Sequence, residues 1–313
     1  MNKISPAVLP SLAIATTVIV WATAFPAIKL ALRDVEALPL ASIRYAMAAA
    51  LALLWFAWKR PGRIPLSDLL LCTAGGIVAG VGYSVLLNFG QQTVSAGAAS
   101  FLVKTESLWM AALAVLFFKE RFTGWAWAGT ALCVVGVGII ATAQPGGIHL
   151  DAGAPLVLAA AFCSASGFAL QRQFVARHGA LYVAAVMFIA AALALSPWLP
   201  QAQVQMRAAS GVTWGWVLFL GLFPTTLGLV CWVYAMGYFG VARAGNFLYL
   251  VAPLATLIAW AVAAETPKIT TIAGGLVILV GVVIVNTRNR RQAPGEVASP
   301  AAATPARSCV DGT

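Results

Sequence analysis

Four charged side chains lie inside apolar stretches of the sequence, where a charge has chemical consequences. They are Lys29, Arg44, Lys104 and Glu106. A charge within a membrane is costly and usually faces a cavity or a partner. Arg44 would lie ~9 Å from the outer edge of its predicted helix, and Lys104 and Glu106 roughly 12–17 Å from theirs, at about 1.5 Å of rise per residue. Three positive charges against one negative charge favour an anionic or carboxylate-bearing ligand.

The spacing of Lys104 and Glu106 predicts that they do not pair with each other. Two residues apart on a helix, they point about 200° away from each other, so each needs a separate partner. Glu106 could meet Arg44, which would leave Lys104 free to contact an anionic substrate. Glu106 is also the one carboxylate predicted deep in the bilayer. Burial favours its neutral form, so it could carry a proton and couple transport to a proton gradient.

Structural alternatives remain open for the same side chains. Glu106 could form a constitutive ion pair with Arg44. Lys104 could pair with Glu106 of a dimer mate, or it could extend to the outer surface of the membrane. Lys29 lies near the outer end of its stretch and is interpreted as such a surface anchor.

Polar and aromatic side chains in the apolar stretches add candidates for a binding site. Asn246 and Tyr249 are three residues apart and share a helix face. The alternative for Tyr and Trp near the ends of spans is anchoring at the membrane interface. Other residues that could line a cavity are Tyr83, Asn88, Trp109, Gln171 and Tyr234. The predicted substrate-binding residues are Trp21, Arg44, Gln91, Lys104, Asn246 and Tyr249.

No motif of an enzyme, a metal centre or an ATP-driven pump occurs in the sequence. There is no GxxxxGK phosphate loop, and neither HExxH nor GxSxG is present. Both histidines fall in predicted loops and no cysteines form a CxxC, so we expect no metal, no cofactor and no catalytic residue. The net charge of +10 comes from scattered basic residues. Without a large basic patch, nucleic acid is not an expected partner.

The composition indicates that a lipid bilayer surrounds most of the chain. Of its 313 residues, 61% are hydrophobic and 9% are charged, against about 25% charged in soluble domains. A soluble domain of this length could not bury so much apolar surface, and each membrane span needs about 20 apolar residues. The sequence therefore predicts an all-α membrane protein with ten transmembrane helices. The predicted spans cover approximately residues 8–30, 38–58, 69–90, 95–118, 123–143, 153–174, 180–199, 213–236, 243–264 and 269–287.

The distribution of lysine and arginine between the loops predicts the orientation. Three basic residues, Arg33, Arg207 and Lys268, fall on one side. Cytoplasmic loops carry the excess of basic residues, so we expect both termini in the cytoplasm of a multi-pass inner-membrane protein. The thirteen on the other side are Lys3, Lys59, Arg60, Arg63, Lys119, Arg121, Arg172, Arg177, Arg243, Arg288, Arg290, Arg291 and Arg307.

The two halves of the sequence resemble each other. Glu120 and Glu265 each begin the pattern E-x8-G-x6-G, and residues 98–102 match residues 244–248. We interpret both glutamates as carboxylates that stabilise the start of the next helix. The glycines of this pattern, and those of Gly76-x3-Gly80, are interpreted as sites of close helix packing.

Each half has five predicted spans. Because five is an odd number, the second half enters the membrane from the opposite side and the two halves have opposite orientations. We predict a first repeat over residues 1–143, a second over 152–287, and a disordered cytoplasmic tail over 288–313, which is rich in Ala, Pro, Ser and Arg. Two inverted five-helix repeats are typical of alternating-access carriers, whose binding site lies near the middle of the membrane.

These residues also carry a resemblance to a known family. The segment Trp21-Ala-Thr-Ala-Phe25, Arg44, and the two glutamate segments with their glycines are similar to EamA-type members of the drug/metabolite transporter (DMT) superfamily. The resemblance covers about residues 8–287. It implies a ten-helix bundle with a central cavity lined by spans one to four and six to nine. Spans five and ten would lie outside as support.

Family members move amino acids, other small metabolites or drugs, often outward. We therefore expect a secondary transporter, not an enzyme, that exports a small metabolite such as an amino acid or organic anion by alternating access. An uptake permease or facilitator, and a non-transporting structural membrane protein, are the alternatives. A membrane-embedded enzyme acting on lipid would need clustered His, Asp or Ser at one membrane face. The expected partners are a small-molecule substrate and the lipid bilayer, with a homodimer left open.

Overall fold

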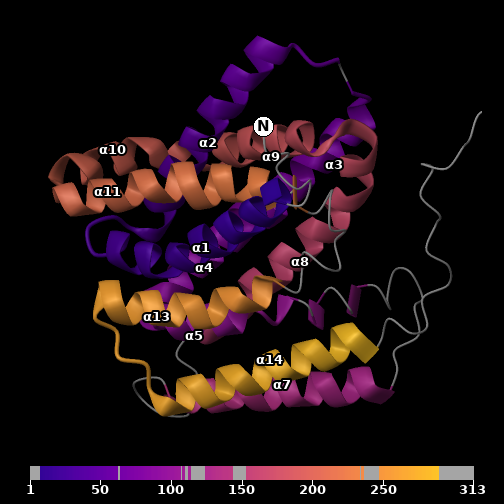
Figure 1. Cartoon of the computed structure of the whole chain (residues 1–313). Coiled ribbons are helices and arrows are strands. Elements are labelled where there is room, and N and C mark those ends of the chain that lie inside the picture. Colours follow the sequence, from indigo (N-terminus) through magenta and orange to yellow (C-terminus); the bar gives the residue numbers. More distant parts are fainter. Residues whose placement is uncertain are drawn as a thin grey trace, which may run out of the picture.

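A computed structural model shows that the chain folds into helices throughout its described part. That part comprises residues 8–62, 64–106, 108–109, 112–113, 124–143, 153–232, 234–235 and 247–288. Every regular element in these ranges is a helix, as the composition predicts (Figure 1). The elements of the first half are α1 (Val8–Ala31), α2 (Ala37–Lys59), α3 (Leu66–Gly76), the π-helix η1 (Ile77–Gly82), α4 (Tyr83–Thr93), α5 (Ala96–Val103) and α7 (Gly124–Ala143).

The described elements of the second half are also all helical. Its elements are α8 (Gly153–His178), α9 (Ala180–Leu195), the 3-10 helix η2 (Ser196–Trp198), α10 (Leu199–Ala208), α11 (Gly211–Leu220), the π-helix η3 (Gly221–Leu227), the 3-10 helix η4 (Leu248–Leu250), α13 (Val251–Ala263) and α14 (Ile269–Arg288).

Within the described ranges, five continuous helical segments are long and apolar enough to cross a membrane. They are Val8–Ala31, Ala37–Lys59, Leu66–Thr93, Leu181–Ala208 and Gly211–Trp232. Four shorter apolar helices are Trp127–Ile140, Gly153–Gly167, Leu248–Ala263 and Ile269–Ile284. The predicted fourth span, 95–118, is described only in pieces, and Glu120, Asn246 and the predicted tail from residue 289 onward lie outside the described residues.

Residues 199–208 form a helix where the sequence suggested a loop between spans. Pro200 occupies the first turn of α10, a position that needs no backbone N–H donor. The side chains of α10 hold the α1–α2 loop: Gln201 Nε2 donates to Glu36 Oε2 at 2.8 Å, and the Glu36 N–H donates to Gln205 Oε1 at 3.0 Å. The polar side chains that suggested a loop therefore form contacts between loop and helix.

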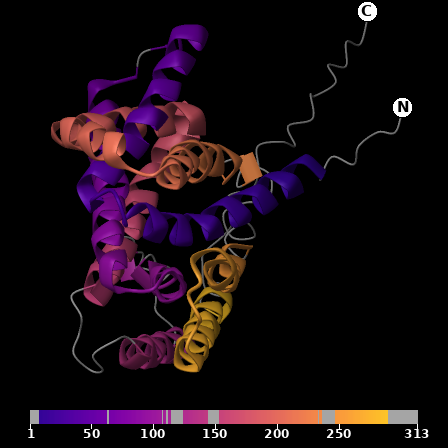
Figure 2. The same cartoon turned by 90° about the vertical axis from the view of Figure 1, so that its left-hand side faces the viewer.

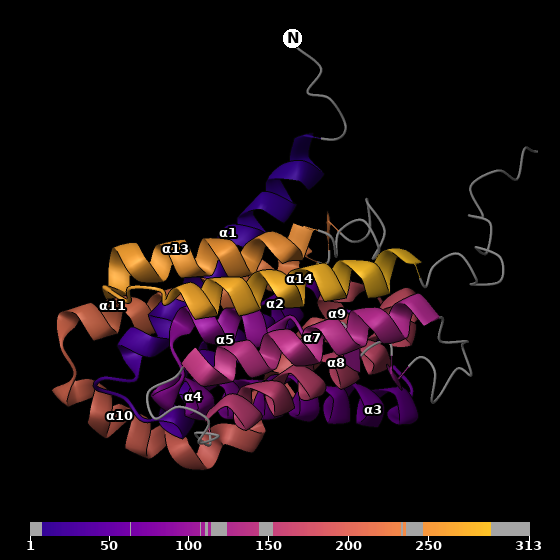
Figure 3. The same ribbon diagram turned by 90° about the horizontal axis from the view of Figure 1, so that it is seen from below.

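Helices α7 and α14 lie side by side at one edge of the molecule (Figures 1 and 2). Glycines allow this close approach. A Cβ added to Gly136 would lie 2.7 Å from the Gly274 carbonyl oxygen, and one added to Gly274 would lie 2.8 Å from the Gly136 oxygen. Both glycines belong to the repeated E-x8-G-x6-G pattern, so the prediction that these glycines permit close packing is confirmed. Figure 3 shows the same pair from below.

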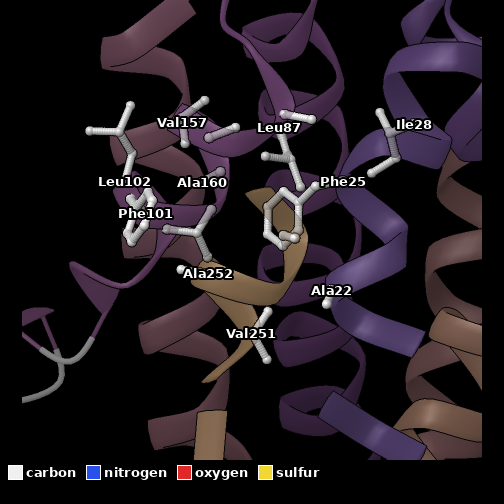
Figure 4. Packing of buried hydrophobic residues seen from close by; sticks show 14 of the residues in the cluster. Ala22, Phe25, Ile28, Leu87, Phe101, Leu102, Val157, Ala160, Val251 and Ala252 are labelled. Atoms are coloured by element: carbon white, nitrogen blue, oxygen red, sulfur yellow. The ribbon is translucent and has the colours of Figure 1, made fainter. Parts of the chain in front are cut away.

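The buried core joins the two halves of the chain. Phe25 of α1 and Phe101 of α5 pack in one cluster with Val157 of α8 and Val251 of α13 (Figure 4). Each of these side chains is buried. The junction of the halves is therefore packed by apolar side chains that surround the site described below.

Glu265 stabilises a helix of the opposite half. Its Oε2 accepts a hydrogen bond at 2.9 Å from the N–H of Ala96, the first residue of α5. Ser95 caps the same helix through its side chain, which accepts from Ala98 N at 3.2 Å. A carboxylate at a helix N-terminus is favourable. The expected type of interaction is present, but Glu265 makes it with α5 and not with the next helix, α14.

Candidate functional site

A cavity of about 180 Å³ lies at the junction of the two halves. Its lining comes from α1, α2, η1, α4, the end of α5, α8, α9, η3 and α13. None of the described residues of α7 or α14 lines it, which agrees with the arrangement that the family resemblance implies. Most lining side chains are apolar, and a few are charged or carry hydroxyl groups, as is usual for a small-molecule site.

Arg44 of α2 lines this cavity and is 6% exposed. Its Nη2 donates to Thr225 Oγ1 of η3 at 3.3 Å. Its Nε and Nη1 have no acceptor among the described residues. The expected ion pair between Arg44 and Glu106 does not form in the described part of the chain, because Glu106 contacts other groups.

Lys104 and Glu106 approach each other, contrary to the helical spacing argument. Lys104 Nζ lies 4.0 Å from Glu106 Oε1 within one chain, at the long limit of an ion pair. Helix α5 ends at Val103, and the Lys104 and Thr105 N–H groups donate to Phe101 and Leu102 in tight turns. The prediction of opposite directions assumed an unbroken helix and is wrong. A dimer mate is not required for this pair.

Ser164 of α8 completes the polar cluster at Glu106. Its hydroxyl donates to Glu106 Oε2 at 3.0 Å. Lys104 from the first half and Ser164 from the second half thus each contact one oxygen of the Glu106 carboxylate. A change in the charge of Glu106 would therefore alter its contacts to both halves.

Two π-helices face the cavity, one from each half, and η1 and η3 begin 144 residues apart (Ile77 and Gly221). This spacing is close to that of the sequence repeats, 145 residues between Glu120 and Glu265 and 146 between residues 98 and 244. Each π-helix has a carbonyl that accepts a hydrogen bond from an aromatic side chain. Tyr45 OH donates to Gly80 O at 3.0 Å, and Trp21 Nε1 donates to Pro224 O at 3.0 Å. Such π-helical segments are frequent at functional sites.

Three of the predicted substrate-binding residues line the cavity, together with the predicted proton carrier. They are Trp21, Arg44 and Lys104, with Glu106. Gln91 does not line it: its Nε2 donates to Phe25 O at 3.0 Å and fixes α4 against α1. Tyr249 packs against the core and is also outside this lining.

Lys29 binds the C-terminal end of a neighbouring helix. Its Nζ donates to the carbonyl oxygens of Gln91 at 2.7 Å, Gln92 at 3.1 Å and Val94 at 3.4 Å. These carbonyls belong to the C-terminal end of α4, where a cation is favourable. This removes Lys29 from the charges available to a ligand.

Four hydroxyl-bearing residues of the lining were not singled out as binding candidates from the sequence. They are Tyr45, Ser84, Ser164 and Thr225. Ser164 lies 143 residues after Trp21, an offset close to the 145 residues between Glu120 and Glu265, so the repeat held a signal for it. Thr225 follows Pro224, and a proline inside an apolar run was the sequence feature that marked this irregular segment. No group of three or more His, Cys, Asp or Glu that could hold a metal is found among the described residues.

Comparisons with known proteins agree with this architecture. The model of the EamA-like transporter family matches residues 9–142 and again residues 151–287. A probable terminal-alkyne amino-acid exporter of Streptantibioticus cattleyicolor is 34% identical over 287 residues, which cover 90% of this chain and 95% of that protein. The uncharacterized transporter YdfC of Bacillus subtilis is 31% identical over 263 residues, 84% of this chain and 86% of that protein.

A probable amino-acid metabolite efflux pump of Salmonella typhimurium is 26% identical over 287 residues, which cover 85% of this chain and 91% of that protein. A solved crystal structure superposes with a TM-score of 0.63 at 19% identity, covering 91% of this chain and 99% of that one. At that identity the structural match bears on the fold alone. The family match spans most of the sequence, and the chain is therefore a multi-pass membrane protein of the EamA-like transporter family.

Proposed function

We propose that the protein is a secondary transporter of the cytoplasmic membrane that exports a small metabolite, such as an amino acid or organic anion, by alternating access. Ten transmembrane helices in two inverted five-helix repeats, residues 1–143 and 152–287, form the transporter, with both termini in the cytoplasm. The observation that carries the proposal is the cavity at the junction of the halves, with charged and hydroxyl groups in a mostly apolar lining. A site between repeats is what alternating access requires.

The outward direction is supported by the names of two relatives. One is a probable amino-acid exporter and another a probable amino-acid metabolite efflux pump. Both names also support an amino acid or a related molecule as cargo. The orientation of the chain by its basic residues does not by itself give a direction of flux.

The lining residues have distinct proposed roles. Arg44, Lys104 and Trp21 contact the substrate, and Asn246 remains a predicted contact. Glu106 carries the coupling proton: when it is neutral, the attraction of Lys104 is lost, and Lys104 becomes available to an anionic substrate. The contacts of Glu106 with Lys104 and Ser164 support this role, because they link its charge to both halves.

Flux through proteoliposomes tests this function. Purified wild type, Lys104→Ala and Glu106→Gln would be reconstituted, and uptake of radiolabelled amino acids and organic anions measured with and without a pH gradient. We expect wild-type flux that the gradient stimulates. Lys104→Ala should raise the half-saturating substrate concentration several-fold, and Glu106→Gln should abolish the response to the gradient.

Two variants outside the cavity provide matched controls, Lys59→Ala and Glu36→Gln, and both should behave like wild type. If Lys104→Ala and Glu106→Gln also transport like wild type, the assigned roles are wrong. If the wild type moves none of these compounds under any gradient, the assignment as an exporter of amino acids or organic anions is contradicted.

A further inference from the structure

Arg44 indicates which chemical class of substrate the cavity accepts, an inference that rests on the transport function proposed above. We propose that the cavity binds its substrate through a single carboxylate group held by the Arg44 guanidinium, with a small apolar body packed against the aromatic wall. Both amino acids and simple monocarboxylates contain this group.

The guanidinium of Arg44 has unused hydrogen-bonding capacity in a buried position. The side chain is 6% exposed, and its one hydrogen bond within the described residues, at 3.3 Å, goes to the neutral hydroxyl of Thr225. That hydroxyl is itself engaged, since it donates to Leu220 O at 2.7 Å. With Nε and Nη1 lacking acceptors, at least three of the five N–H donors of the guanidinium are unused. A buried cation without a partner is costly, and an anionic ligand would remove that cost.

The other charges near the cavity are engaged, which makes Arg44 the source of its net charge. Lys104 lies beside Glu106 at 4.0 Å, and these two charges offset each other. Lys29 binds the carbonyl groups at the end of α4. While Glu106 is ionised, one positive charge is therefore left over among the described side chains that line the cavity. A single carboxylate neutralises it, whereas a cation or a doubly charged anion would not.

The geometry of a guanidinium suits a carboxylate in particular. Its planar donors match the two oxygens of a carboxylate, and charge-assisted bonds of this kind are roughly twice as strong as neutral ones. Lysine provides only a point charge. This difference allows the chemistry of the proposed contact to be tested by a charge-conserving substitution.

The volume and the walls of the cavity set the size of the rest of the substrate. The cavity measures about 180 Å³. A cavity of about 150 Å³ holds benzene, and pockets for drug-sized ligands measure roughly 300–1,000 Å³. Trp21, Phe25, Met187 and Phe188 supply large apolar or aromatic walls. The body of the substrate is therefore apolar and comparable to the side chain of a small or medium-sized amino acid.

Binding of a matched set of probes to the purified protein tests the inference. The probes are L-norvaline, its amide, valerate and L-tryptophan. Norvaline and the amide differ in the carboxylate, norvaline and valerate differ in the ammonium group, and tryptophan tests size. We expect at least one of the five-carbon acids to bind wild type, and both the amide and tryptophan to bind at least tenfold more weakly.

Variants of Arg44 provide the second arm. Arg44→Gln should weaken binding of the acid at least tenfold, and Arg44→Lys should have an intermediate effect because it keeps the charge but loses the planar donors. Arg33→Gln, at an exposed arginine outside the cavity, should bind like wild type. Comparison of acid and amide needs no variant, so poor folding of an Arg44 variant would not obscure the result.

The inference is overturned if the amide binds as well as the acid, if neither acid binds wild type, or if Arg44→Gln binds the acid like wild type. A preference between norvaline and valerate identifies the source of the carboxylate, and the inference holds for either. Normal binding without any flux in proteoliposomes would contradict the proposed transport function and leave the carboxylate site intact.

Discussion

Lys29 illustrates how the fold determines the role of a single charge. From the sequence it belonged with Arg44 and Lys104, because all three are basic residues in apolar stretches. In the fold its ammonium group meets three carbonyl oxygens at the end of α4, while Arg44 retains unused donors. Sequence could identify the charged residues, but the assignment of roles depends on which backbone groups the neighbouring helices present.

We predict that Lys29→Met lowers stability and leaves substrate binding unchanged. The substitution removes a cation from the C-terminal end of α4, an interaction that contributes about 0.3–2 kcal/mol. The melting temperature in detergent should therefore decrease by a few degrees, with the dissociation constant of the transported substrate the same as in wild type. A change in that constant with no change in melting temperature would place Lys29 in the substrate site instead.

At the scale of elements, long apolar stretches and spaced glycines were readable from the sequence, whereas irregular backbone was not. The break between α4 and α5 was predicted near residues 91–95, and α5 begins at Ala96. The end of α5 at Val103 and the π-helices η1 and η3 were not predicted. A π-helix differs from an α-helix by a shift of its backbone hydrogen bonds. Here Tyr45 and Trp21 donate hydrogen bonds to carbonyl oxygens within η1 and η3. Such partners come from other helices, so a local pattern does not reveal them.

The α1–α2 loop makes the start of α11 sensitive to pH through Asp34. The Thr213 hydroxyl donates to Asp34 Oδ2 at 2.6 Å, and the Ser210 N–H and hydroxyl each donate to it at 3.1 Å. These bonds, with that of Thr213 the largest effect, hold the pKa of the Asp34 carboxyl below its usual value. Because folding lowers this pKa, the resulting stabilisation is present above the unfolded value of about 3.9 and is lost as the pH falls through the folded value.

We predict that the difference in melting temperature between wild type and Asp34→Asn is constant above about pH 5 and shrinks below about pH 4, by the linkage of proton binding to stability. Thermal unfolding in detergent across this range measures it. Thr213→Val, which removes the principal donor, should reduce the same difference at neutral pH. A difference that grows as the pH falls would show that the sign of the effect is wrong.

At the scale of the whole molecule, the last helices of the two halves pack against each other away from the cavity. Helices α7 and α14 cross where Gly136 and Gly274 meet, and the Cys133 thiol donates to Ile278 O at 3.4 Å. Neither helix contributes a described residue to the cavity lining. The cavity formed by the other helices is therefore separate from the packed helix pair, which lies at one edge of the molecule (Figure 2).

This separation predicts that a bulky residue at the crossing of α7 and α14 affects stability more than substrate affinity. Gly136→Leu would place its Cβ 2.7 Å from both the Gly274 oxygen and Ile278 Cγ1, and overpacking of this kind costs about 1–3 kcal/mol. Gly138→Leu is the matched control on the same helix, since a Cβ there meets nothing within 4 Å. We expect the melting temperature of the Gly136 variant to fall below that of the Gly138 variant, with equal substrate dissociation constants for the protein that remains folded. Equal melting temperatures would mean that the two helices separate without cost, and a weakened affinity in Gly136→Leu alone would mean that this helix pair shapes the cavity after all.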